Sequence, residues 1–284
     1  MTSSQPAAPL SPASRRSELA LRVASALVMA PLAVAIAWYG GWPFALFWGL
    51  VSLGVLWEWS GLVAPDERRA LIGAGGLALV LSTAFAIIEL NDRAAILIVM
   101  GALAAAAFAP RDRRAWAAGG VIYAGAIGLA PVLLRADAEF GFIAIALVFA
   151  VVWSTDIVAY FVGRAVGGPK LWPRVSPKKT WSGAIGGTVA ATAVGAAVVA
   201  SSTPVSLAPL VLVGILLSVV SQGGDLFESA VKRRFGVKDA SNLIPGHGGV
   251  MDRLDGFLTA ALAAAALGML HQGPEAVARG LLIW

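Results

Sequence analysis

The chain has 284 residues, of which 58% are hydrophobic and 13% charged, with a formal net charge of +5. Soluble domains carry about 25% charged residues, so this composition, with recurring apolar runs of about 20 residues, predicts a polytopic membrane protein. The absence of cysteine excludes disulfides, thiolate metal sites and thiol catalysis, and two histidines are too few for a histidine-built metal site. A metal ion would need carboxylate ligands, which favours a hard ion such as Mg²⁺.

Residues 1–18 are rich in Pro, Ser and Ala and lack an apolar period, which predicts a disordered tail. The first apolar run is too long for the core of a signal peptide, and further spans follow it, so an uncleaved anchor is expected. We predict an all-α protein with about nine transmembrane helices. They cover residues 19–39, 43–63, 71–90, 94–109, 115–134, 140–162, 184–201, 206–222 and 257–272.

The spans divide into about five N-terminal helices within 19–139 and a C-terminal region, 140–284, that holds two long polar segments. With the N-terminus in the cytoplasm, 18 of the 21 Lys and Arg residues fall in cytoplasmic segments. This positive-inside bias predicts a cytoplasmic N-terminus and a C-terminus outside. Orientation and anionic headgroups account for the positive charge, so no nucleic-acid partner is expected.

The first polar segment, 163–183, carries five cations and no acid. It is either a cluster that fixes orientation and touches lipid phosphates or a phosphate site, and the sequence leaves both open. In the second segment, 223–256, a helical register places Asp225, Ser229 and Lys232 on one face. A carboxylate that can hold a cation thus stands near a lysine that can reach a phosphate.

The alternative for this face is an exposed helix end with a weak Glu228–Lys232 ion pair. Further along, the glycines of IPGHGG (Ile244–Gly249) allow backbone N–H groups to turn toward an anion. If a helix begins near Met251, Asp252 and Asp255 share one face and Arg253 turns away. Acids suit a first helical turn in any case, but two acids beside a glycine loop also suit a metal–polyphosphate site.

Two more acids lie in predicted spans. Asp156 is about two turns inside its span, where a charge is costly unless it faces a polar cavity or a partner such as Arg164. It therefore lines a cavity or forms an ion pair. Glu58, between Trp57 and Trp59, lies closer to an interface and is interpreted as structural.

The stretch SAVKRRFGVKDASNLIPGHGGVMDRLD (Ser229–Asp255) resembles the signature of phosphatidate cytidylyltransferases, also called CDP-diacylglycerol synthases. DIVAYFVGR (Asp156–Arg164) and SPKKTW (Ser176–Trp181) are similar to other parts of that family. The resemblance is strong over roughly 154–257 and only architectural before that. Ser182 departs from the pattern, because the family commonly has Glu there, so no role is carried over to it.

The resemblance implies that CTP and phosphatidate react to give CDP-diacylglycerol and pyrophosphate with Mg²⁺, and it leaves a second cation open. It also suggests a homodimer in the bacterial inner membrane, in contact with membrane lipids, whose active site faces the cytoplasm. Asp225, Asp252 and Asp255 would hold the metal, with Lys232 as a further catalytic residue. The other implied site residues are the phosphate-binding Ser176, Lys179, Thr180, Ser229, Arg233, Lys238, Gly246, His247, Gly248 and Gly249, and Asp156 as organiser of the cavity.

Two rival functions remain. An ion-coupled transporter with Asp156 and Asp225 as ion sites predicts inverted repeats and charges near the midplane. The sequence shows no such repeat, and its acids gather at one surface. Another CTP-using lipid enzyme, such as a polyprenol kinase or a cytidylyltransferase for an ether-lipid phosphate, is harder to separate, because an acyl pocket consists of ordinary Leu, Ala and Val.

Overall fold

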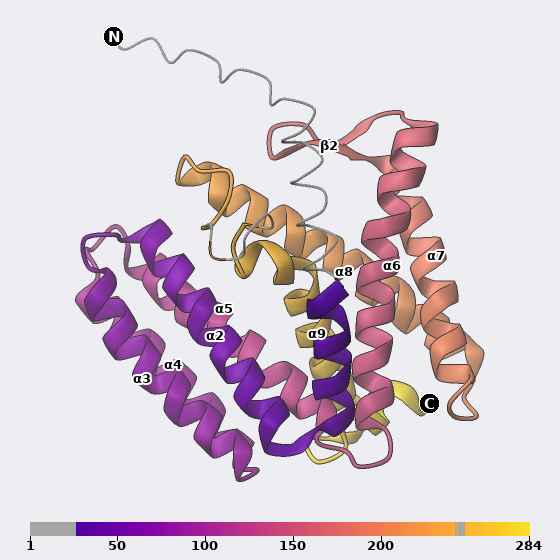
Figure 1. Ribbon diagram of the computed structural model, residues 1–284, viewed down its shortest axis with the longest axis horizontal. Coiled ribbons are helices and arrows are strands. Elements are labelled where there is room, and N and C mark those ends of the chain that lie inside the picture. Colours follow the sequence, from indigo (N-terminus) through magenta and orange to yellow (C-terminus); the bar gives the residue numbers. More distant parts are fainter. Residues whose placement is uncertain (1–26, 242, 244–247) are drawn as a thin grey trace.

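The computed structural model describes residues 27–241, 243 and 248–284 (Figure 1). The predicted tail, 1–18, and the first part of the predicted span 19–39 lie outside the described residues. The remainder of that span is an apolar helix, Leu27–Tyr39.

Helices make up most of the described chain, and eight of them are long and apolar enough to cross a membrane. The all-α polytopic architecture is therefore confirmed. In chain order the helices are α2 (Gly41–Val63), α3 (Arg68–Ile87), α4 (Asn91–Phe108), α5 (Arg114–Arg135), α6 (Gly141–Val166), α7 (Trp181–Ala200), α8 (Leu207–Arg234), α9 (Met251–Gln272) and the short α10 (Val277–Leu282).

The connections alternate between the two ends of the bundle. Figure 1 shows the α2–α3 turn, the α6–α7 connection and the α8–α9 connection toward the top, and the α3–α4, α5–α6 and α7–α8 connections toward the bottom. Helix α8 continues well past residue 222, the predicted end of its span, to Arg234. Polar residues 223–234 therefore extend a spanning helix at the same end as the α6–α7 connection.

Small residues allow α6 and α7 to pack closely. A Cβ atom on Gly183 would lie 2.6 Å from the carbonyl oxygen of Ala159, and one on Gly187 would lie 2.8 Å from that of Thr155. Only glycine fits at such distances, as at other close crossings of membrane helices. The Gly183–Gly187 pair is thus a helix-packing feature.

The α6–α7 connection contains a two-stranded antiparallel hairpin that the all-α prediction missed. Strand β1 (Lys170–Trp172) pairs with β2 (Ser176–Thr180), and Lys170 lies opposite Thr180. Strand β2 runs directly into α7, where Thr180 Oγ1 accepts the Gly183 N–H at 3.1 Å and caps the helix. The hairpin therefore fixes the cationic segment against α7.

Glu58 on α2 connects the N-terminal helices to the start of α9. Its side chain is buried, with 2% of the residue exposed. Oε1 accepts the Val250 N–H at 2.8 Å and the Ser241 hydroxyl at 2.6 Å, and Oε2 accepts the Met251 N–H at 2.7 Å. The first N–H groups of a helix have no partner within it, so a carboxylate of another helix caps α9. This bears out the structural interpretation of Glu58.

Replacement of Glu58 by Ala should lower the free energy of unfolding by about 1–3 kcal/mol, because it leaves buried N–H groups without an acceptor. The measurement is the unfolding midpoint of the purified protein in detergent. Glu275→Ala, which removes an exposed carboxylate, is the matched control and should change stability by less than about 0.5 kcal/mol. Equal midpoints for the two variants would show that Glu58 does not hold α9.

Candidate functional site

A polar pocket of about 510 Å³ lies between α6, the β-hairpin, α7 and α8. It joins residues that are far apart in the sequence, including four of the predicted site residues. Its charged and polar lining consists of Thr155, Asp156, Tyr160 and Arg164 from α6, Lys170, Lys178, Lys179 and Thr180 from the hairpin, and Gln222 and Asp225 from α8. Three of the five cations of segment 163–183 thus come from the hairpin into one pocket, which favours the phosphate-site interpretation of that segment.

Lys179 and Asp225 form an ion pair across this pocket. Asp225 Oδ1 also accepts the Ser229 hydroxyl at 3.4 Å, as the predicted register on α8 requires. Both members of the ion pair keep more than a quarter of their side-chain surface exposed, 29% for Lys179 and 27% for Asp225. The pair is therefore accessible to a ligand that enters the pocket.

Asp255 of α9 belongs to the same electrostatic group. Its carboxylate lies close enough to Asp225 and Asp156 for the three negative charges to repel one another, and Lys179 attracts both Asp156 and Asp255. Arg253 also acts on Asp156, so two cations only partly offset the repulsion among the three acids. A bound cation would relieve this repulsion.

A second cluster, formed by Glu228, Lys232 and Asp252, is largely shielded from solvent. Lys232 Nζ donates to Glu228 Oε1 at 2.9 Å and to Asp252 Oδ1 at 2.5 Å. Glu228 is fully buried at 0% exposure, so the weak, exposed Glu228–Lys232 pair considered above is wrong. Glu228 Oε2 has no hydrogen-bond partner within the described part of the chain.

Asp252 also fixes the end of the glycine loop. Its Oδ2 accepts the Ala240 N–H at 3.0 Å and the Gly249 N–H at 2.8 Å. Helix α9 begins at Met251, earlier than the predicted span 257–272 and as the shared face of Asp252 and Asp255 requires, yet these two acids face different partners. Asp252 holds the loop and Lys232, whereas Asp255 belongs with Asp225 and Asp156.

Glycine is required at two positions of this loop. Gly248 has φ +84°, a left-handed conformation that side chains disfavour. A Cβ atom on Gly249 would lie 2.6 Å from Glu58 Oε1, so the α9 cap and the loop can approach only with glycine there. Gly246 and His247, the other two predicted loop residues, lie outside the described residues.

The remaining predicted site residues are more peripheral. Ser176 begins β2 and is not among the described residues that line the polar pocket. Arg233 is exposed and donates to the Val237 carbonyl oxygen at 2.9 Å, and Lys238 is exposed in the following turn. Arg253 acts electrostatically on Asp156 of α6.

The donor chemistry of the pocket fits Mg²⁺. Within the described residues, no three His, Asp or Glu side chains already form a metal-ligating group. Mg²⁺ often takes one or two carboxylates and completes its coordination with water and substrate phosphates. Mutually repelling carboxylates beside a cationic hairpin therefore suit an ion that arrives with a phosphate ligand.

Lys232→Met should destabilise the protein by about 3–5 kcal/mol, because it leaves two carboxylates without their cation in a buried place. Adding Glu228→Gln should recover part of this loss, since it removes one of the uncompensated charges. Unfolding midpoints of the two single variants and the double variant in detergent measure this coupling. Strict additivity would contradict the buried network.

Known proteins similar to this chain are cytidylyltransferases. The model of the cytidylyltransferase family matches residues 20–271. Phosphatidate cytidylyltransferases of Brucella abortus and Brucella melitensis are each 43% identical over 263 residues, which cover 91% of this chain and 96% of theirs. That of Bacillus subtilis is 46% identical over 121 residues, 42% of this chain and 45% of its own. The chain therefore belongs to the cytidylyltransferase family.

Proposed function

We propose that this chain transfers CMP from CTP to phosphatidate and so produces CDP-diacylglycerol and pyrophosphate. The names of its relatives support this substrate pair. The observation that carries the proposal is the polar pocket, where the hairpin lysines face the acids of α6 and α8. Such a pocket suits two substrates that both carry phosphate groups.

The pocket would face the cytoplasm of a bacterial inner membrane. The distribution of Lys and Arg supports this orientation, since the pocket lies at the end of the bundle where the cationic segment 163–183 folds. CTP would enter from the cytoplasm, and phosphatidate from the surrounding lipid. We also propose a homodimer, as the family resemblance suggests.

Asp225 and Asp255 are our proposed Mg²⁺ ligands, with Asp156 beside them. The ion would neutralise charge on the reacting phosphates and the leaving pyrophosphate. Asp252 is already bound by Lys232 and two backbone N–H groups, so its proposed role is to position the glycine loop. Lys179, which is paired with Asp225 in the structure, would turn to a substrate phosphate.

The proposed transfer needs no covalent enzyme intermediate. A phosphatidate oxygen would form a bond to the α-phosphorus of CTP while the bond from that phosphorus to the bridging oxygen breaks, and pyrophosphate leaves. Most of the catalysis would come from positioning and charge neutralisation. Lys170, Lys178 and Lys179 are placed to supply that charge.

The first test is incorporation of radiolabelled CTP into lipid by the detergent-purified protein. Product should form with phosphatidate and Mg²⁺ and should be absent with EDTA, because the acids of the pocket would repel the phosphates without a metal. CTP labelled in the α-phosphate reports CMP transfer to phosphatidate or an ether-lipid phosphate, whereas CTP labelled in the γ-phosphate reports phosphoryl transfer to a polyprenol, so the two labels separate the related enzymes. A folded protein that labels none of these lipids would overturn the proposal.

Asp225→Asn should reduce kcat/KM by about 100-fold, because a proposed metal ligand and the partner of Lys179 are both lost. Asp66→Asn, in the exposed turn between α2 and α3, is the matched control and should retain full activity. The Mg²⁺ concentration for half-maximal rate should rise only in the first variant. Unchanged activity and Mg²⁺ dependence in Asp225→Asn would contradict the proposal that Asp225 binds the metal, but it would not contradict the proposed reaction.

A further inference from the structure

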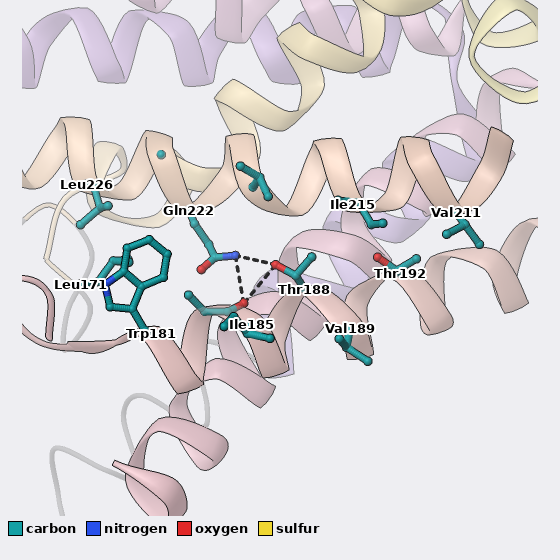
Figure 2. A pocket seen from close by; sticks show the side chains of 13 residues that line it. Leu171, Trp181, Ile185, Thr188, Val189, Thr192, Val211, Ile215, Gln222 and Leu226 are labelled. Carbon is teal, nitrogen blue, oxygen red and sulfur yellow. Dashed lines mark hydrogen bonds between the residues drawn. The ribbon is translucent and has the colours of Figure 1, made fainter. Parts of the chain in front are cut away.

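An apolar groove of about 620 Å³ runs along α7 and α8, beside the polar pocket (Figure 2). Trp181, Ile185 and Val189 line it from α7, and Ile215 and Val219 line it from α8. These positions recur every four residues, so each helix contributes one continuous face. The groove is thus formed by the regular packing of two spanning helices.

The groove and the polar pocket meet. Leu171, Ala184 and Gln222 line both of them. At this junction Gln222 Nε2 donates to Thr188 Oγ1 at 3.0 Å and to the Ala184 carbonyl oxygen at 3.4 Å, as Figure 2 shows. The side-chain amide of Gln222 therefore lies where the charged lining of the polar pocket gives way to the apolar lining of the groove.

The length of the groove suits one leaflet of a bilayer. Its α7 side extends from Trp181 to Thr192, which at the rise of an α-helix is about 17 Å. Half of a hydrocarbon core of roughly 30 Å is about 15 Å. A chain that starts at the polar pocket and follows the groove would therefore cross one leaflet.

We infer that this groove holds one acyl chain of the lipid substrate while the lipid phosphate lies in the polar pocket. This inference rests on the proposed function and extends it to the part of the substrate that does not react. Charge complementarity supports it, because the cations lie at one end of a continuous surface and apolar side chains at the other. A molecule with an anionic head and a long apolar tail matches this pattern.

Ile215 lies about 10 Å along α8 from Gln222, so it is well inside the groove. In Ile215→Trp the larger ring should obstruct a long chain and leave room for a short one. We expect kcat/KM for dioleoyl phosphatidate to fall at least about tenfold, and that for dioctanoyl phosphatidate to stay within about twofold. Leu212→Trp, also on α8 but outside the described lining of the groove, is the matched control and should change neither value.

A second readout does not depend on turnover. Phosphatidate with a photoreactive diazirine at the end of one acyl chain should label peptides from α7 and α8 in the unaltered protein, and Ile215→Trp should reduce that labelling. Labelling confined to other helices would overturn the inference.

The outcomes of the kinetic test also separate the inference from the proposed function. If the unaltered protein converts neither lipid, the proposed function fails. If it converts both, and Ile215→Trp affects them equally or not at all, the acyl-chain assignment fails. A change of oligomeric mass in Ile215→Trp without dependence on chain length would instead identify the groove as a contact between two copies and overturn the assignment.

Discussion

The first N–H groups of α9 must find acceptors, because no residue of their own helix can supply them. Glu58 approaches from α2 and takes two of these groups, and Asp252 takes the Gly249 N–H just before them. This requirement places α2 against the α8–α9 connection. The N-terminal half of the chain, where the family resemblance is only architectural, therefore supports the segment that carries the signature.

The charges near α8 fall into two groups with different solvent access. In the buried group, Lys232 is held between Glu228 and Asp252 and stabilises the local fold. In the open group, Lys179 and Asp225 line a pocket. A charge in the first group can change partners only at a large desolvation cost, whereas one in the second can turn to a ligand. Helix α8 thus carries both Lys232, which stabilises the local fold, and Asp225, which is accessible to a ligand.

Features that depend on neighbouring residues could be predicted from the sequence. Apolar runs located the spanning helices, and the register of Asp225 and Ser229 on α8 and the start of α9 at Met251 agree with the structure. Features that depend on contacts between distant segments could not. The partners of Asp252 and the contacts of Glu58 with Ser241 and Val250 follow from how helices pack. The short β-hairpin could not be predicted because its lysines and prolines are not typical of a strand.

The close approach of Gly249 to Glu58 also has an evolutionary consequence. Any side chain at position 249 would collide with the carboxylate, and a smaller residue at position 58 would make space but leave the α9 N–H groups without acceptors. Neither residue can therefore be substituted alone without destabilising the protein. Substitutions at these two sites, which lie in opposite halves of the chain, should therefore be inherited as a pair, together with some new acceptor for the backbone.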